Sequence, residues 1–292
     1  ATDATQDAAD AVTGAADDVR SEVHHVAAGG PLPFENETYV KVNGAVSEDR
    51  NAPYANGTRF SLFNHGDVSN KTGATLNSEG VTNGVTNFLR PEDGCWHASD
   101  ANVYFFATTD RNNLTSPDSA ATGPDAGQVG CSRLWAVTFD DVTRIDSSGA
   151  VTARIELLLD GTEGGDMFDN LAIDTDGVIY LCEDAGNNRH ISKVWAYHTS
   201  TGAFTAIARL DPDKFGDIVN GTYRAPTPPF VDDKETSGII DVTGLFVSAP
   251  WFKPGSKVLL VVVQAHFKYD ENDAIGAELV EGGQLLLLVK AP

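Results

Sequence analysis

The chain has 292 residues, a formal net charge of −22 and 41% hydrophobic residues. This length suits one large all-β domain or two ordinary domains, and the hydrophobic content is sufficient for a sizeable core. The acidic balance argues against nucleic acid and anionic membranes as partners, because both repel negative charge, and it favours divalent cations.

The first 30 residues differ from the rest of the chain. Small apolar residues recur every three or four positions between Ala4 and Val26, which places them on one face of a helix. Gly29-Gly30-Pro31 would end that helix. We expect an N-terminal helical segment at 1–30 that either packs on its own domain or docks on a second copy, so self-association through it is one predicted partnership. The chain begins with Ala1, as expected of a mature form without its leader or of a fragment.

Short β runs replace the helical pattern from about residue 38. Turn sequences such as Asp174–Gly177 and Thr199–Gly202 join neighbouring runs, and each ends in a glycine that can take a positive φ. We therefore expect an all-β domain at 31–292 made of antiparallel meanders, β-propeller-like or alternatively a sandwich. Residues 211–236 are rich in Pro and Asp and are expected to form a surface loop. The predicted strands are Tyr39–Val42, Arg59–Phe63, Val103–Thr108, Arg133–Phe139, Val151–Leu158, Val178–Cys182, Lys193–Tyr197, Phe204–Leu210, Ile239–Val247, Val258–Gln264 and Gln284–Lys290.

Several features predict an extracellular protein without a membrane span. The longest apolar runs, Val258–Val263 and Leu285–Val289, are strand-length and far short of the about 20 residues that a membrane helix needs. Cys95 and Cys131 flank a polar loop and are a candidate disulfide, whereas Cys182 lies in an apolar run and is expected to be a buried thiol. The N-x-Ser/Thr glycosylation pattern, typical of secreted proteins, occurs at Asn36, Asn56, Asn70, Asn113 and Asn220.

Acidic segments fall at the expected strand ends. Carboxylate, amide and carbonyl oxygens are the ligands that Ca²⁺ prefers, and loops at one end of a β scaffold are where such ligands can converge. Adaptation to salty surroundings would explain the bulk charge equally well, but not this placement. Asp174 and Asp176 are interpreted as a hairpin turn, and His266 as a metal ligand, a phosphate contact or a polar strand cap. The acidic segments are Arg90–Gly94, Asp166–Asn170, Cys182–Asn188, Glu235–Gly238 and Asp241.

The order of these segments resembles a known family. Leu89–Gly94, followed by Val103–Thr108, is similar to the R-P-E-D segment and next strand of the PhoX-type alkaline phosphatases. Phe168–Gly177 resembles the family's P-D-N-L-x-x-D-x-x-G segment, with Phe168 in place of proline. The series includes Gly130–Trp135, Leu181–Asp184, Glu235–Thr243 and Val263–His266, and spans roughly residues 86–268.

The resemblance implies a β-propeller of secreted phosphatases in which calcium and iron bind phosphate monoesters. By that similarity Arg90 and His266 are the expected catalytic residues, with Arg90 contacting phosphate, and Glu92 is an expected metal ligand. The further calcium-ligand candidates are Asp169, Asn170, Glu183, Asp184 and Glu235.

The resemblance is to the C-terminal half of the family framework. The N-terminal half of the family supplies a cysteine near iron and an N-H-E segment, and residues 1–85 contain neither. Two hypotheses therefore stand side by side. One is a calcium-dependent phosphatase acting on phosphate monoesters, with Fe³⁺ as a second candidate ion. The alternative is a non-catalytic extracellular structural or assembly glycoprotein built on a calcium-stabilised propeller scaffold.

Overall fold

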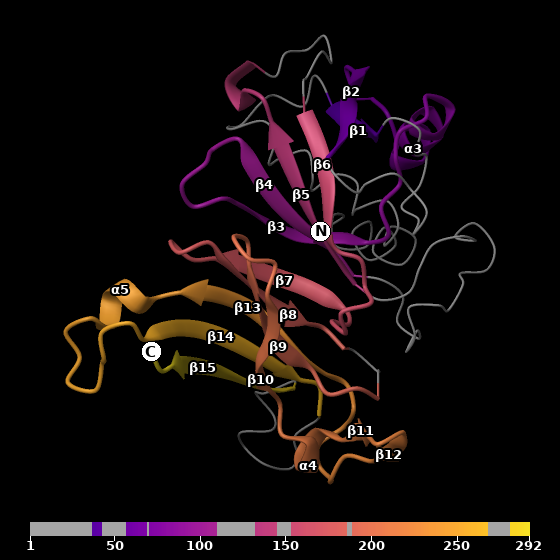
Figure 1. Ribbon diagram of the computed structural model, residues 1–292. Coiled ribbons are helices and arrows are strands. Elements are labelled where there is room, and N and C mark those ends of the chain that lie inside the picture. The colour runs from indigo at the N-terminus through magenta and orange to yellow at the C-terminus, as the bar shows by residue number, and fades with distance from the viewer. Residues whose placement is uncertain are drawn as a thin grey trace, which may run out of the picture.

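The computed structural model describes residues 37–42, 57–68, 70–109, 132–144, 153–185, 189–267 and 281–292, and these form an all-β fold of antiparallel sheets (Figure 1). The described helices are α3 (Gly73–Thr82), α4 (Pro212–Phe215), α5 (Thr243–Phe246) and a 3-10 turn at Val142–Arg144. The strands are β1 (Glu37–Val42), β2 (Thr58–Gly66), β3 (Pro91–Trp96), β4 (Val103–Thr108), β5 (Arg133–Phe139), β6 (Ala153–Leu159), β7 (Phe168–Ile173), β8 (Val178–Glu183), β9 (Lys193–His198), β10 (Phe204–Arg209), β11 (Asp217–Val219), β12 (Thr222–Arg224), β13 (Lys234–Asp241), β14 (Lys257–Ala265) and β15 (Gly282–Lys290).

The three main sheets follow one another along the chain. The first sheet has the order β1-β2-β6-β5-β4-β3, the second β10-β9-β8-β7 and the third β13-β14-β15, while β11 and β12 form a separate ribbon. The second and third sheets are meanders in which consecutive strands pair, as the succession of turn sequences predicts; in the first sheet the meander β3 to β6 is extended by β2, which pairs with β6, and by β1. The turn Asp174–Gly177 joins β7 to β8 with Gly177 at φ 79°, and Gly202, at φ 70°, lies between β9 and β10.

The second sheet is packed on both of its faces. Phe105 and Leu134 of the first sheet pack against Leu171 and Leu181 of the second. On the opposite face of the second sheet, Tyr180 packs with apolar residues of β13 and β14. Burying these side chains contributes about 1.5–3 kcal/mol each. The stacking order of the sheets thus follows from strands that carry apolar residues on one or both faces.

The all-β expectation is confirmed, but the described strands do not close into a ring. The β-propeller thus remains a prediction for the architecture as a whole. The predicted helical segment at 1–30 lies outside the described residues.

The predicted strands match the structure best where the strand is buried. Val103–Thr108 and Arg133–Phe139 are observed with the expected bounds. The strand predicted at Ile239–Val247 is wrong at both ends: β13 runs from Lys234 to Asp241, and the chain then turns into α5. The reason is local, because the Asp241 carboxylate accepts a hydrogen bond from the Thr243 N–H at 2.8 Å and starts a turn.

The surface loop expected at 211–236 carries more regular structure than predicted. Asp211 caps α4 by accepting a hydrogen bond from the Asp213 N–H, and β11 and β12 form a hairpin behind it. The last three residues of this range already belong to β13.

Two of the five glycosylation candidates lie on described residues, and both are exposed. These are Asn70, beside α3, and Asn220, in the turn between β11 and β12; Asn36, Asn56 and Asn113 lie outside the described residues. Cys182 is a fully buried thiol, as expected. Cys95 is half-buried in β3, and its candidate partner Cys131 is also outside the described residues. Among the helices that the structure describes, none has the length and apolarity required to cross a membrane.

Candidate metal centre

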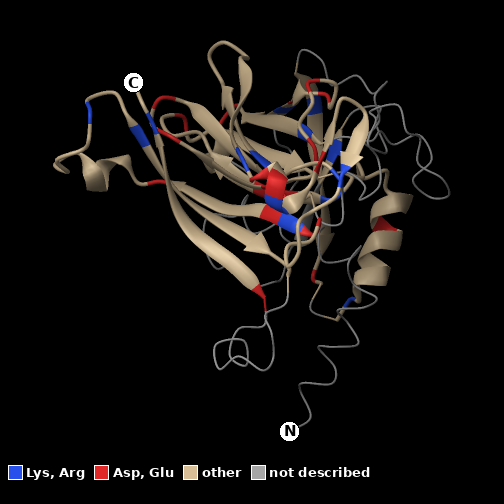
Figure 2. Cartoon of the chain, turned by 90° about the horizontal axis from the view of Figure 1, so that it is seen from below, with Lys and Arg blue, Asp and Glu red and all other residues tan. Residues whose placement is uncertain are grey.

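One edge strand from each of the three main sheets lies in the middle of the molecule. Strand β7 contacts both β3 and β13, and each of these three is an edge strand of its own sheet. Viewed from below, acidic and basic residues lie together near the centre of the molecule (Figure 2). Side chains from segments far apart in the sequence can therefore meet here.

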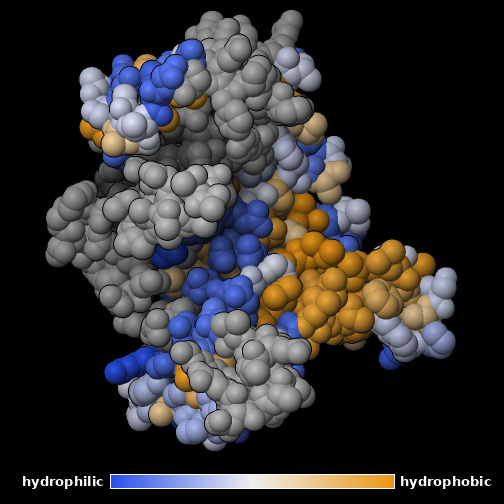
Figure 3. All heavy atoms as spheres, turned by 180° about the vertical axis from the view of Figure 1, so that it is seen from behind, coloured by the Kyte–Doolittle hydropathy of each residue, from blue (hydrophilic) through white to orange (hydrophobic). Residues whose placement is uncertain are grey.

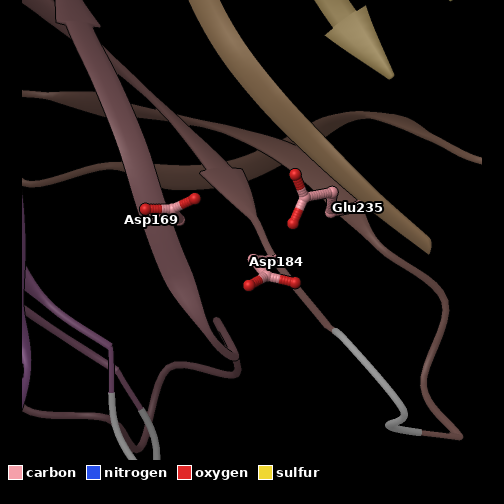
Figure 4. Close-up of side chains that lie close together, drawn as sticks. All are labelled: Asp169, Asp184 and Glu235. Carbon is pink, nitrogen blue, oxygen red and sulfur yellow. The ribbon is translucent and has the colours of Figure 1, made fainter. Parts of the chain in front are cut away.

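Three carboxylates meet at this junction. Asp169 lies on β7, Asp184 follows the end of β8 and Glu235 lies on β13, and one oxygen from each lies within 4.8 Å of the other two (Figure 4). Asp184 and Glu235 also form an isolated antiparallel bridge, which ties the second sheet to the third. We call these three residues the acidic triad.

Irregularities in the strand backbone direct side chains into this junction. The strand register shifts between Pro91 and Gly94 in β3, between Phe168 and Leu171 in β7, and between Thr236 and Ile239 in β13. Such bulges re-aim side chains and are enriched beside active sites. The residues directly before β3 and β7, Arg90 and Met167, both take a φ of 53°, a conformation that costs a non-glycine residue free energy.

Glu92 and Arg90 approach the triad from the first sheet. The Arg90 guanidinium is 3.4 Å from the Glu92 carboxylate, and Glu92 is close enough to Asp169 and Asp184 to feel their charge. The neighbouring Asp93 holds β3 against β7 by accepting a hydrogen bond from the Leu171 N–H at 3.0 Å. The motif around Arg90 thus supplies the positively charged Arg90 guanidinium and the additional Glu92 carboxylate to the site.

Burial and mutual repulsion make ionisation of these acids costly. Burial, opposed by Arg90 and reinforced by Asp169, raises the pKa of Glu92 to about 7. Burial and then Asp184 raise the pKa of Asp169 to about 6, and burial and Asp184 raise the pKa of Glu235 to about 8. Carboxyl groups held together in this way ionise more readily when a cation lies between them.

His266 and Asn170 lie at the rim of the triad rather than within it. The His266 ring is 2.7 Å from the Glu281 carboxylate, and its charge also acts on Glu235. Burial is the largest single influence and lowers the pKa of His266, but Glu281, Asp233 and Glu235 together outweigh it and raise the pKa. The Asn170 side-chain oxygen accepts a hydrogen bond from the Ser237 hydroxyl at 3.0 Å, and Ser237 is within reach of Gln264.

Glu183 is placed away from the triad, contrary to its expected role as a ligand. Its carboxylate accepts hydrogen bonds from the N–H of Asp166, the N–H of Lys193 and the Trp195 indole, at 3.0, 2.8 and 2.6 Å. Successive residues of a strand point to opposite faces, so Glu183 faces away when Asp184 faces the triad. Burial raises its pKa to about 7, but three donors hold the carboxylate in place, and we assign it a structural role.

A second acidic group surrounds Lys257. The Lys257 ammonium lies 2.9 Å from Asp174, 2.8 Å from Asp176 and 3.8 Å from Asp241. Asp174 also accepts hydrogen bonds from the N–H groups of Asp176 and Val178, as its interpretation as a hairpin turn predicts. These bonds and Lys257 lower the pKa of Asp174 despite its burial.

Sequence reasoning missed the residues that fasten the sheets around the site. The Thr109 hydroxyl donates to the Phe168 carbonyl at 2.6 Å, and the Ser132 hydroxyl accepts from the Phe168 N–H at 2.7 Å. Thr236 accepts a hydrogen bond from the Glu183 N–H at 2.9 Å. Their only sequence signal is a hydroxyl residue at a strand end, which is common and unspecific.

Neither protein-family models nor curated protein sequences give a match to this chain. The resemblance to the PhoX-type alkaline phosphatases therefore stays a prediction that rests on the motifs themselves. The spatial convergence of residues from those motifs is independent of any comparison.

Proposed function

We propose that this chain is a secreted, calcium-dependent, phosphatase-like protein that hydrolyses phosphate monoesters beside the acidic triad. The observation that carries the proposal is the convergence of Asp169, Asp184 and Glu235, from three separate segments, with Glu92 and Arg90 next to them. Calcium is the proposed ion, and iron is a second candidate.

The donor set fits a hard divalent cation. All four acids offer carboxylate oxygens, which Ca²⁺ takes in sets of six to eight together with amides, carbonyls and water. Asn170 and Gln264 stand at the rim with amide oxygens of the same kind. The raised pKa values of Glu92, Asp169 and Glu235 measure how unfavourable the ionised cluster is without such an ion.

Arg90 supplies the group that would recognise phosphate. Its guanidinium is partly exposed beside Glu92, and a planar fork of N–H donors suits two phosphate oxygens at once. When bound, the cation would neutralise the phosphate and polarise the P–O bond. Arg90 would hold the ester in place and stabilise the negative charge that develops during the reaction. His266, with its raised pKa, can carry a proton at the rim.

The test is turnover of p-nitrophenyl phosphate by the full chain with calcium and iron supplied. Wild type is compared with the double variant Arg90→Ala, Glu92→Ala and with Asp176→Asn, an exposed acid outside the site. We expect the double variant to lose at least about 100-fold in rate, as removal of a charge-stabilising donor does, and Asp176→Asn to retain wild-type rates. Wild-type rates no better than those of the double variant would rule out the proposed phosphatase activity.

The alternative is the non-catalytic calcium-stabilised scaffold. It is favoured by the absence of the family's N-H-E segment from residues 1–85. Turnover with calcium separates the two functions, and metal analysis of the purified native protein tests both. Calcium with iron favours the enzyme, calcium alone is compatible with either function, and a preparation that contains neither metal argues against both.

A further inference from the structure

The last strand, β15, forms the open edge of the third sheet. It pairs with β14 on one side, and among the described strands nothing pairs with its other side. Its residues Gln284–Val289 contain four leucines and a valine without charge or proline. Natural edge strands usually carry charges, prolines or bulges that prevent pairing with another chain. None of these interrupts β15 before Lys290.

The third sheet is buried mainly on one of its faces, although Val258 on the other face is also buried and Leu286 on the buried face is 41% exposed. Ile239, Leu259 and Val261 are buried against the second sheet. The residues that alternate with them point the other way and remain exposed, Leu285 by 66% and Leu287 by 46%. The apolar face comprises Ile240, Val262, Leu285, Leu287 and Val289.

A broad hydrophobic area appears where this sheet faces the solvent (Figure 3). Apolar patches of this kind on soluble proteins mark interaction sites. In a chain with a net charge of −22, a segment free of charge is also where two copies approach with least repulsion.

We propose that β15 pairs with β15 of a second copy, edge to edge and antiparallel, about a two-fold axis. Centring the pair on Leu286 aligns all nine residues, with Gly282 opposite Lys290 and Leu285 opposite Leu287. Residues that lie opposite one another in an antiparallel pair share a face of the sheet, so the apolar face of one copy continues into the apolar face of the other. The product is a six-stranded sheet across the dimer with no open edge at its centre. Two-fold pairing of one patch with itself is the commonest way in which identical chains associate.

The charge at the end of β15 favours this orientation. Lys290 ends the strand, and antiparallel pairing places the two Lys290 side chains at opposite ends of the interface, each opposite Gly282, whereas parallel pairing in register would set them side by side. Because the edge from Gly282 to Val289 carries no charge and aligns with itself on matching faces, the occupant that it fits is a second copy of the same chain.

The experiment is the mass of the full chain by light scattering and sedimentation over a range of concentrations. We expect a dimer of the 31.0 kDa chain for wild type and a monomer for the double variant Leu285→Lys, Leu287→Lys. In that variant four lysines would face one another across the two-fold axis, and the dissociation constant should rise at least about 100-fold. The matched controls are Val81→Lys on α3 and Val219→Lys on β11, exposed valines on elements outside the third sheet, and both should remain dimeric. A monomeric wild type, or a dimer that the double variant preserves, overturns the proposal.

A charge exchange keeps the test valid if the double variant fails to fold. Leu285→Lys alone and Leu287→Glu alone each place like charges near one another in a homodimer, so each should weaken dimerisation by on the order of 10-fold. Mixing the two variants sets the introduced lysine of one chain opposite the introduced glutamate of the other and should restore a heterodimer. Failure of the mixture to associate better than either variant alone overturns the antiparallel pairing.

Discussion

Two groups of acids lie in this molecule, and they are balanced in different ways. Asp174, Asp176 and Asp241 surround the Lys257 ammonium, and the pKa of the buried Asp174 is lowered. The acidic triad has Arg90 only at its margin, by way of Glu92, and the pKa values of Asp169 and Glu235 are raised. The first group includes its own cation, Lys257, and stabilises a turn, whereas we propose that the second binds a metal cation. Clustering of carboxylates alone does not distinguish them.

Removing the Lys257 ammonium should produce the largest change in the free energy of unfolding. Lys257→Met leaves the Asp174 carboxylate, which has no exposed surface, beside Asp241 without a counter-charge. We expect the free energy of unfolding to fall by about 3 kcal/mol, the lower end for breaking a buried ion pair, since Lys257 itself is partly exposed. Urea denaturation measures the change, with the exposed Lys253→Met as the matched control. A loss no greater than that of the control would mean that Lys257 is not the balancing charge.

Adding calcium, the proposed ligand of the acidic triad, should produce the next largest effect on stability. Calcium at 100 times its dissociation constant should stabilise the wild-type fold by about 2.7 kcal/mol, provided that it binds the folded state alone. The gain should vanish in Glu235→Gln, which removes one triad carboxylate, and persist in Glu183→Gln, whose carboxylate is held by Trp195 and backbone N–H groups instead. Thermal unfolding with and without calcium checks this, and an equal loss of the calcium effect in both variants would contradict the placement of Glu183.

The pH dependence of stability should follow the triad when no divalent cation is supplied. The pKa values of Glu92, Asp169 and Glu235 are raised in the folded state, so unfolding releases protons and stability falls as the pH rises. The fall should begin near the ordinary carboxyl pKa and end at about pH 8, the highest of the three. It should be smaller than the calcium effect, since solvent screens these half-buried groups. Denaturation curves from pH 5 to 9 with a chelator test the sign, and a rise over that range contradicts it.

Substituting Asp176, the exposed acid beside Lys257, should change the free energy of unfolding least. Asp176 has a 70% exposed side chain, and exposed ion pairs contribute little. We expect Asp176→Asn to cost about 0.5 kcal/mol and to leave calcium stabilisation intact. A cost as large as that of Lys257→Met would show that burial does not govern this group.

The sequence predicted the buried strands better than the strands that carry the site. Val103–Thr108 is a mostly apolar run with a paired strand on either side, and its pattern specifies its bounds. Strands β3 and β7 were read as acidic segments at strand ends, because Pro91 and the pairs Glu92-Asp93 and Asp169-Asn170 resemble turns more than strands. Bulges let these polar residues remain in the sheet, and bulges are set by tertiary packing rather than by local preference.

The candidate site was predictable in membership but not in geometry. The ordered motifs identified Asp169, Asp184 and Glu235, which the structure brings together. The same motifs included Glu183, because adjacent residues of one segment cannot be assigned to opposite faces until the register of β8 against β9 is known. The sequence likewise did not predict that β15 lies at an open edge, since Leu285–Val289 has the same composition as a buried strand.

Calcium titration calorimetry on the full chain tests the central claim most directly. The account predicts saturable binding by wild type, retained in Asp176→Asn and lost in Asp184→Asn, which removes the triad carboxylate that bridges to Glu235. Circular dichroism shows whether each variant keeps its fold. Wild-type protein that binds no calcium, or Asp184→Asn protein that binds it as tightly as wild type, would contradict a metal centre at Asp169, Asp184 and Glu235.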